Sequence, residues 1–505
     1  MLQDTAALYS ALVARDPRFD GVFYVGVTST GIYCRPVCTA RTPKRANCRF
    51  FDSAAAAERA SFRPCLRCRP ELAPGNAPVD DAHRIANLVA HRIDEGMLDD
   101  GASLEKIARQ FGWSARQIRR IVQKELGVSP IELVMTRRLL LAKQLLTETT
   151  LPITQVALAS GFSSLRRFND AFSGRYGMPP TRFRQATDGA TRTSTATPDV
   201  LTLQLTYRPP FDWSGMLHFL SARATNGVER IQDDAYLRTV QLGPHRGWIR
   251  VRHAPERKTL LVDLTRSLTP VLPALLGRLR HLFDLSARPD VIDAHLAQDA
   301  LLSSAVRRHP GLRVPGTFDG FELAVRAILG QQITVKAATT LAGRFATAFG
   351  EPIETPHAGL SRLGPTPHRI AAATVDEIAS LGIIQSRAQG IIALAREITS
   401  GRLVLDAGAE PDAMIEQLIA LPSIGKWTAH YIAMRALRWP DAFPKEDVVL
   451  RKVLGGVSAT RADALSQAWR PWRSYATLHL WQHAAQRSGD VSSDTRPSTL
   501  GASSR

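Results

Sequence analysis

All five cysteines of this 505-residue chain fall between positions 34 and 68. Four of them form two close pairs, Cys34-x3-Cys38 and Cys65-x2-Cys68, which are separated by 26 residues. Each pair can supply two adjacent corners of a tetrahedral thiolate site, so this spacing predicts a bound Zn²⁺. Cys48 lies outside both pairs and is expected to be an ordinary free cysteine. The odd number of cysteines argues against a disulfide framework. The alternative to a zinc site is a redox-active or incidental cluster of cysteines.

The net charge of the chain indicates what kind of molecule the protein binds. Lys and Arg number 64 against 46 Asp and Glu, which gives a net charge of +18. Such an excess favours a polyanion such as nucleic acid, although an arginine-rich soluble protein is the alternative. The N-terminal segment lacks a signal-peptide core, and no run approaches the ~20 apolar residues of a membrane span. We therefore expect no membrane association and a cytoplasmic, nucleoid-associated protein. The length of 505 residues is too great for a single core and predicts three or four domains.

Two helical hairpins with the same plan follow the cysteines. In the first, a short helix over 103–110 precedes a helix that starts at Ser114, and in the second, a helix over 152–160 precedes one that starts at Ser163. An apolar helix over 131–147 joins them. Each unit alone is a weak signal, but two helix-turn-helix units with basic second helices predict major-groove binding to double-stranded DNA.

The second helix of each unit is expected to bury its apolar face and turn its polar face to DNA. The apolar residues expected to be buried are Ile118, Ile121, Val122, Leu165, Phe168 and Phe172. The residues expected to contact DNA are Arg116, Gln117, Arg119, Arg120, Arg166, Arg167 and Asn169.

The remainder of the chain divides by composition. Residues 186–199 contain almost no large apolar side chain and predict a flexible linker. Short alternating segments then predict an antiparallel sheet with one or two helices over 200–285. Residues 286–487 are predicted to be almost entirely helical, and the Ser- and Thr-rich segment 488–505 is predicted to be a disordered tail.

The segment LPSIGKWTAHYIAMRAL at 421–437 predicts a helix, a tight hairpin turn and a second helix. Backbone N–H groups in such a turn bind phosphate without regard to sequence. The segment resembles the helix-hairpin-helix of the base-excision DNA glycosylases, and within them the AlkA-type 3-methyladenine glycosylases. The resemblance covers about 200–485 and rests also on TYRPPFDW (206–213), RVPGTFDGFE (313–322), AILGQQIT (327–334) and RPWRSYATLHLW (470–481).

This resemblance implies an AlkA-type α+β domain over 200–285 and an all-α helix-hairpin-helix glycosylase domain over 286–487. It implies that an alkylated purine, such as 3-methyladenine or 7-methylguanine, is flipped out of the duplex and released by hydrolysis of its N-glycosidic bond. Asp447 occupies the position of the family's carboxylate, which would stabilise an oxocarbenium-like transition state. Its neighbour Glu446 would point elsewhere.

Further residues take roles from the same resemblance. Trp427, Tyr431 and Trp481 match the aromatic walls of the base pocket, and the first two are also i and i+4 on one helical face. Since Trp427 stands where bifunctional relatives carry a Schiff-base lysine, glycosylase activity without strand cleavage is expected. Gln332 stands at the wedge position, although the best-known member has leucine there. Ser423 replaces a frequent hairpin glycine, which matters if that position needs a positive φ.

The hairpin residues Gly425 and Lys426 are expected to contact DNA. No iron–sulfur cluster is expected, because no cysteine follows position 68.

The segments TSTGIYCRPVCTAR (28–41) and FRPCLRCRPE (62–71) resemble the N-terminal domain of the Ada adaptive-response regulators, and the resemblance continues to about residue 185. It implies a small α+β zinc methyl-acceptor domain over 1–78 and an all-α AraC-type double helix-turn-helix domain over 79–185. Cys34 would be both a zinc ligand and the irreversible acceptor of a methyl group from a DNA methylphosphotriester. Cys38, Cys65 and Cys68 would complete the site.

Thr30, Arg41 and Arg63 match positions near the DNA phosphate. The methylated protein would activate transcription at a promoter operator, with RNA polymerase as a partner. No O6-methylguanine methyltransferase activity is expected, because the second reactive cysteine of full-length Ada has no counterpart here.

Together, the two resemblances imply a multidomain protein of the alkylation-damage response. One alternative is a transcription regulator that uses a catalytically silent glycosylase fold as a DNA clamp. Another is a purely structural zinc site without methyl transfer.

Overall fold

A computed structural model describes residues 5–15, 20, 23–51, 54–70, 113–187, 199–405 and 411–493, together with isolated residues between 85 and 108. The chain divides into two compact units, residues 1–137 and 138–505. Most of the expected helix over 103–110 and most of the expected linker lie outside the described residues.

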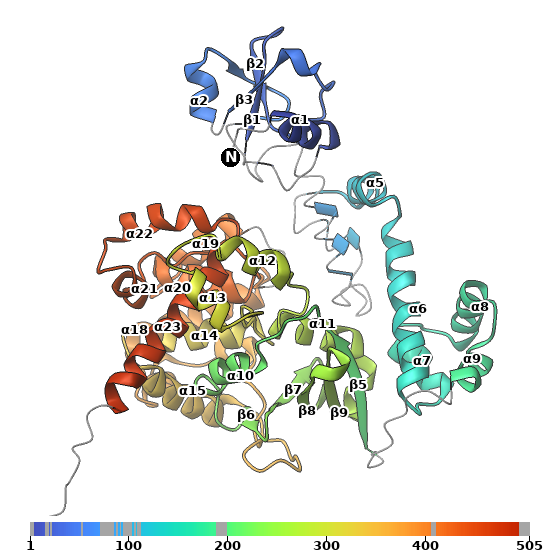
Figure 1. The fold of residues 1–505 in the computed structure, drawn as a ribbon. Coiled ribbons are helices and arrows are strands. Elements are labelled where there is room, and N and C mark those ends of the chain that lie inside the picture. The colour runs from blue at the N-terminus through green and yellow to red at the C-terminus, as the bar shows by residue number, and fades with distance from the viewer. Residues whose placement is uncertain are drawn as a thin grey trace, which may run out of the picture. The chain divides into compact units, whose positions relative to one another are not determined.

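The N-terminal part of the first unit is a small α+β fold. Its strands form a four-stranded sheet in the order β3-β1-β2-β4, in which only β2 and β4 are parallel (Figure 1). The elements are α1 (Thr5–Ala14), β1 (Tyr24–Val27), β2 (Ile32–Cys34), β3 (Cys48–Phe51), α2 (Ala54–Arg59) and β4 (Arg63–Pro64).

Five helices follow: α5 (Ala115–Leu126), α6 (Pro130–Glu148), α7 (Ile153–Ala159), α8 (Leu165–Tyr176) and α9 (Pro180–Thr187). Ser114 caps α5 in a capping box, and Gly127 ends it in the left-handed conformation (φ 76°). The expected apolar face of α5 is buried, as are Phe168 and Phe172 of α8. The expectation for Leu165 was wrong, since its side chain is 41% exposed. Leu165 is the first residue of α8, and the buried face begins one turn later.

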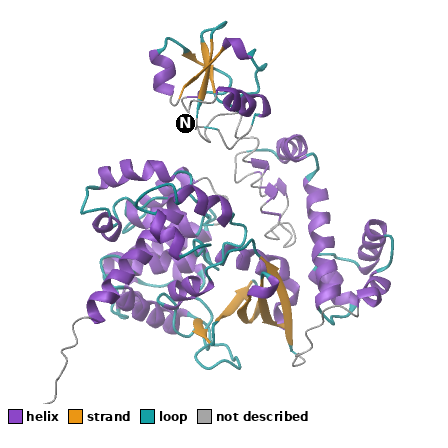
Figure 2. Cartoon of the chain, in the orientation of Figure 1, coloured by secondary structure: helices purple, strands orange, loops and turns teal. Residues whose placement is uncertain are grey.

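A five-stranded antiparallel sheet in the order β5-β9-β8-β7-β6 opens the C-terminal part of the second unit. Figure 2 shows its strands gathered in one layer. In β5, buried Leu201, Leu203 and Leu205 alternate with more exposed residues, as expected for a sheet with one face on a core. The elements are β5 (Val200–Thr206), α10 (Trp213–Ser221), β6 (Glu229–Gln232), β7 (Ala235–Leu242), β8 (His245–Ala254), β9 (Thr259–Thr265) and α11 (Leu272–Leu282).

Helices make up most of the rest of the second unit and share one hydrophobic core. Helix α14 is central and packs against α15, α18 and α20. Helix α23 continues past the expected domain end at 487. The helices are α12 (Pro289–Leu296), α13 (Ser303–Arg308), α14 (Gly320–Leu329), α15 (Val335–Phe349), α16 (Pro367–Ala371), α17 (Val375–Ala379), α18 (Gln385–Thr399), α19 (Pro411–Ile419), α20 (Lys426–Arg435), α21 (Val448–Val453), α22 (Ala459–Ser466) and α23 (Arg473–Ser493).

Buried polar contacts join the sheet to the helices. Arg238 of β7 donates two hydrogen bonds to the carboxylate of Glu322 on α14, at 3.1 and 3.0 Å. The hydroxyl of Thr239 donates to the carbonyl of Arg362 at 2.6 Å. The sheet therefore supports α14, which in turn carries one wall of the cavity described next.

Candidate functional site

A cavity of about 460 Å³ opens among α14, α15, α20, α21 and α23. The rings of Trp427 and Tyr431 form one wall, stacked with centroids 5.3 Å apart and 11° between their planes. Trp481 of α23 adds a third ring, 6.2 Å from Tyr431. Volume and aromatic lining suit a planar ligand. The lining residues are Arg223, Arg326, Ala327, Gly330, Ile333, Val335, Ala338, Trp427, Tyr431, Asp447, Val449, Trp481, Ala484 and Ala485.

Asp447 is the carboxylate of this cavity and is only 8% exposed. It caps α21 by accepting a hydrogen bond from the backbone N–H of Leu450 at 2.8 Å. The indole N–H groups of Trp427 and Trp481 donate to its two oxygens at 2.8 and 3.4 Å. Three donors thus fix the carboxylate beside the aromatic wall. Glu446 is not among the residues that line the cavity.

An arginine holds the middle ring of the wall in place. Buried Arg435 donates to the Tyr431 hydroxyl at 2.6 Å and to the carbonyls of Pro315 and Gly316 at 2.7 and 2.9 Å. Burial alone would raise the pKa of Tyr431, but the positive charges of Arg435 and Arg223 outweigh it and lower the pKa of this phenol. Sequence analysis missed Arg435, although its i+4 spacing from Tyr431 was a usable signal.

Two other arginines, Arg223 and Arg326, line the cavity itself and were not predicted. Arg223 follows α10, and its guanidinium lies 3.8 Å from the ring centroid of Phe219. Arg326 of α14 donates to the hydroxyl of Thr339 at 2.6 Å. Burial lowers the pKa of both guanidiniums. Neither residue has a spacing relation to the aromatic wall, so only the folded chain reveals them.

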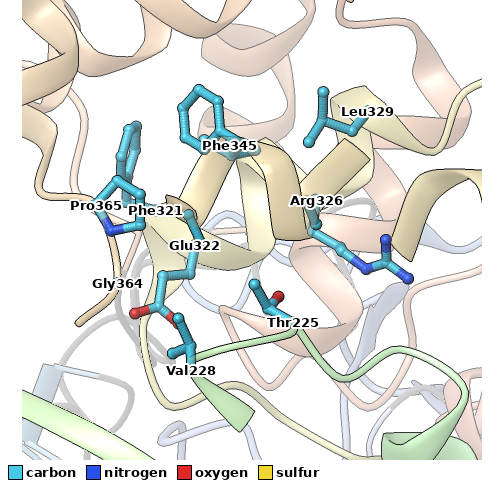
Figure 3. A pocket seen from close by; sticks show the side chains of 12 residues that line it. Thr225, Val228, Phe321, Glu322, Arg326, Leu329, Phe345, Gly364 and Pro365 are labelled. Atoms are coloured by element: carbon cyan, nitrogen blue, oxygen red, sulfur yellow. The ribbon is translucent and has the colours of Figure 1, made fainter. Parts of the chain in front are cut away.

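Arg326 also lines a second, much smaller cavity. Figure 3 shows Glu322 and Arg326 beside the apolar side chains of Phe321, Leu329 and Phe345. Its volume of about 30 Å³ is enough for about one water molecule, not for a nucleobase. The larger cavity is therefore the candidate site.

The expected DNA-contact residues of this half lie outside the large cavity. Gly425 caps α20 without a side-chain hydrogen bond, so within the described chain the first N–H groups of this helix meet no capping side chain. Gly425 and Lys426 are both exposed. Gln332 is exposed too, on the turn between α14 and α15, with a φ of 53°. Ser423 has a φ of 62°, so its position does favour glycine.

Four sulfurs meet in the N-terminal fold. The Sγ atoms of the four paired cysteines lie within 4.8 Å of one another, and all four residues are buried. The parallel pairing of β2 with β4 explains this, because Cys34 ends β2 and the backbone N–H of Cys65 donates to the carbonyl of Tyr33 at 3.0 Å. The backbone N–H of Arg35 donates to Cys68 Sγ at 3.4 Å.

The four sulfurs fit a zinc ion. A tetrahedron with Zn–S distances of about 2.3 Å separates its sulfurs by about 3.8 Å, which falls within the 4.8 Å that encloses these four sulfurs. Hydrogen bonding with Cys38 and Cys68, followed by burial, raises the pKa of Cys34, whereas hydrogen bonds from Cys34 and Cys68 lower the pKa of Cys38. Packed this closely, the thiols need a cation to ionise together.

Two of the three residues expected near a phosphate lie together. The backbone N–H of Arg63 donates to the carbonyl of Gly31, next to Thr30, at 2.8 Å, and both side chains are exposed. Arg41 is exposed in the loop after Cys38, and no described hydrogen bond joins it to either. Cys48 is partly buried, and its thiol donates to the carbonyl of Lys44 at 3.4 Å.

The residues of the helix-turn-helix units divide into exposed and engaged side chains. Gln117 is engaged in the capping box of α5, Arg119 forms an exposed ion pair with Glu105 at 3.2 Å, and Asn169 is partly buried. The other arginines are also exposed: Arg116, Arg120, Arg167, and Arg166, whose Nε lies 4.0 Å from a carboxylate oxygen of Asp170. Among the described helices, none is long and apolar enough to cross a membrane.

A four-sulfur site, a helix-turn-helix formed by α7 and α8, and an aromatic pocket with a buried carboxylate are the features of a DNA-binding regulator joined to a base-excision glycosylase. Models of four protein families match in that order. They are the metal binding domain of Ada over 7–71, a helix-turn-helix domain over 107–186, the AlkA N-terminal domain over 202–319, and the HhH-GPD superfamily of base excision DNA repair proteins over 325–472.

Relatives that match the whole chain or a part of it agree with these family matches. A probable bifunctional transcriptional activator/DNA repair enzyme AlkA of Mycobacterium tuberculosis is 39% identical over 488 residues, which cover 95% of this chain and 97% of the relative. DNA-3-methyladenine glycosylase 2 of Escherichia coli is 36% identical over 55% of this chain and 95% of its own. The bifunctional enzyme Ada of Escherichia coli is 37% identical over 24% of this chain and 33% of its own.

The chain therefore belongs to the family of bifunctional transcriptional activator/DNA repair enzymes that join an Ada-type half to an AlkA-type glycosylase half. The predicted multidomain fold class is confirmed.

Proposed function

We propose that the C-terminal half flips an alkylated purine out of duplex DNA and hydrolyses its N-glycosidic bond. The observation that carries this proposal is the position of Asp447, held by two indole N–H groups at the edge of an aromatic cavity. As the bond from C1′ to the base nitrogen breaks, positive charge develops on the sugar, and the carboxylate stabilises it. The base leaves with the electron pair of that bond, a water oxygen bonds to C1′, and the water gives up one proton to the solvent.

The aromatic wall supports a class of base. Trp427, Tyr431 and Trp481 offer π faces on which a cationic purine such as 3-methyladenine or 7-methylguanine stacks favourably. Lys426 is exposed and does not line the cavity, which supports hydrolysis without a Schiff base and strand cleavage. We assign Gln332 to the wedge that fills the gap left by the flipped base, and Gly425 and Lys426 to the phosphate contact.

The direct test is release of free base from methylated duplex DNA. Wild type should release 3-methyladenine or 7-methylguanine, and Asp447→Asn should lower the rate by about 100-fold or more, because the charge is lost while the shape is kept. Glu446→Gln is the matched control and should retain activity. Loss of activity in Glu446→Gln but not in Asp447→Asn would show that the carboxylate is misassigned. No release by folded wild type would favour the DNA-clamp alternative.

For the N-terminal half we propose that Cys34 accepts a methyl group from a DNA methylphosphotriester. A bound Zn²⁺ would keep the sulfurs deprotonated and Cys34 nucleophilic at neutral pH. The Cys34 Sγ electron pair forms a bond to the methyl carbon, the carbon–oxygen bond breaks, and the phosphodiester leaves as an anion. Cys34 is 9% exposed, against 8% for Cys65, 6% for Cys38 and 0% for Cys68. Thr30, on the turn before β2, and Arg63, at the start of β4, are both exposed.

The methylated half then binds an operator more tightly and activates transcription, with RNA polymerase as its partner. The exposed arginines of α5 and α8 supply the DNA contacts.

Mass spectrometry of the intact protein after incubation with methylated DNA tests the methyl transfer. Wild type should gain the mass of one methyl group, located by peptide mapping at Cys34. Cys48→Ser should gain it as well, and Cys34→Ser should not. A wild-type protein that binds zinc yet gains no methyl group would establish the purely structural zinc site instead.

A further inference from the structure

Two non-glycine residues with positive φ stand on two different turns of the glycosylase half. Gln332 (φ 53°) is on the turn between α14 and α15, and Ser423 (φ 62°) is on the hairpin between α19 and α20. Non-glycine side chains adopt this conformation only at an energetic cost, so the surrounding structure must hold it. These are the turns that the proposed function places on the duplex, the first as wedge and the second as phosphate contact.

One side chain connects the two turns. The amide nitrogen of Gln331, the residue before the wedge, donates to the carbonyl of Ser423 at 2.5 Å and to the hydroxyl of Thr428 on α20 at 3.0 Å. An amide nitrogen carries two hydrogens, so one donor of the Gln331 side chain is used on the hairpin and the other on the helix that follows it.

Helix α18 is hydrogen-bonded to both the wedge turn and the hairpin. Buried Arg387 donates to the carbonyl of Gln331 at 2.5 Å and to that of Leu329 at 3.5 Å. The carbonyl of its neighbour Ser386 accepts a hydrogen bond from the Ser423 hydroxyl at 2.7 Å. The main chain at Gln331 and the strained residue of the hairpin are therefore fixed to consecutive residues of one helix.

We propose that Gln331 is a positioning residue that locks the wedge turn to the phosphate-binding hairpin, so that both turns engage the duplex as one rigid unit. This inference rests on the proposed function. A wedge can enter the base stack only at a fixed offset from the phosphates that the hairpin holds. Gln331 sets that offset and touches neither the base nor Asp447.

Gln331→Met tests the proposal because it keeps the length and approximate volume of the side chain while removing both donors. Gln389→Met is the matched control, since Gln389 is exposed on α18. Both are compared as full chains, with thermal unfolding to confirm that they are folded. In Gln331→Met, kcat for base release should fall by about 10-fold to 100-fold, as for a misplaced reacting group, with KM within about two-fold of wild type.

Fluorescence of 2-aminopurine placed next to the lesion reports unstacking independently of hydrolysis. Measured in the Asp447→Asn background, the signal should rise on binding with the native Gln331 and stay low with Gln331→Met. The fluorescence measurement does not depend on base release, so it tests the role of Gln331 even if the protein releases no base. A failure of the Gln331 proposal can therefore be told apart from a failure of the proposed function.

A double-mutant cycle completes the test. If Gln331 acts through the wedge, Gln331→Met should add little to the loss in kcat caused by Gln332→Ala. The proposal is overturned if Gln331→Met gives wild-type fluorescence and kcat, if the two losses are additive, or if activity falls only in proportion to the unfolded fraction.

Discussion

His479 of α23 is 1% exposed, and neither of its ring nitrogens has a hydrogen-bond partner among the described residues. Burial, assisted by the nearby His309, lowers the pKa of this imidazole to about 4. A histidine in the unfolded chain has a pKa of about 6.5, so between pH 6.5 and 4 the unfolded state binds a proton that the folded state does not. The stabilising contribution is fully present above pH 6.5 and is lost as the pH falls toward 4.

We predict that His479→Leu reduces the acid sensitivity of the glycosylase half. Between pH 7 and pH 5 the wild type should lose about 2 kcal/mol more unfolding free energy than the variant. Urea unfolding at the two pH values measures the difference, with His368→Leu as the control because His368 is exposed. Equal pH dependence in His479→Leu and wild type would contradict the prediction.

Among single residues, those one helical turn apart could be paired from the sequence, whereas those far apart in the chain could not. Trp427 and Tyr431 were predicted to share a face, and their rings stack. Arg223 and Arg326 reach the same cavity from distant segments, because tertiary packing brings them there. The family resemblance supplied Asp447 and Trp481, which no spacing rule connects to the aromatic pair.

The hairpin between α19 and α20 shows how an element depends on one backbone conformation. A positive φ at a non-glycine residue costs about 1–2 kcal/mol, and Ser423 offsets part of this through its hydrogen bond to Ser386, a contribution of about 1 kcal/mol. Ser423→Gly removes both effects and should leave stability nearly unchanged. Ser423→Ala keeps the backbone cost and loses the hydrogen bond.

We therefore expect Ser423→Ala to be less stable than Ser423→Gly by about 1–2 kcal/mol, the reverse of the usual order for these two residues in helices. Thermal unfolding of both variants against wild type measures this. An alanine variant as stable as the glycine variant would show that the turn relaxes to another conformation.

Element type was predictable wherever one periodicity persisted. The alternating segments became β5, β7, β8 and β9, and the amphipathic ones became α5 and α8. Strand β6 was missed because Glu229–Gln232 is short and largely polar, and it forms only by pairing with β7. Leu165 was misplaced because periodicity does not say where along a helix its contacts begin.

At the scale of the whole molecule, charge links the proposed methyl transfer to DNA affinity. Methylation of Cys34 turns an anionic sulfur into a neutral thioether, so the site becomes more positive by one charge. Near several phosphates this change contributes on the order of 1–3 kcal/mol, or roughly 10-fold to 100-fold in Kd.

Titration of operator-length duplex with methylated and unmethylated protein should show this gain at low salt and a smaller gain at high salt. Cys34→Ser, exposed to the same methylated DNA, should show no gain. A gain that is independent of salt would point to a conformational switch rather than to charge.

Because Asp447 is hydrogen-bonded to Trp427 and Trp481, the base pocket can be completed only late in translation. A growing chain folds from its N-terminus, domain by domain. The four sulfurs and the helix-turn-helix units leave the ribosome early, whereas the cavity lacks a wall and the carboxylate lacks a donor until α23 emerges. A chain stalled during translation would therefore carry a complete N-terminal half and no working base pocket, so premature termination silences excision before it silences the proposed methyl acceptor.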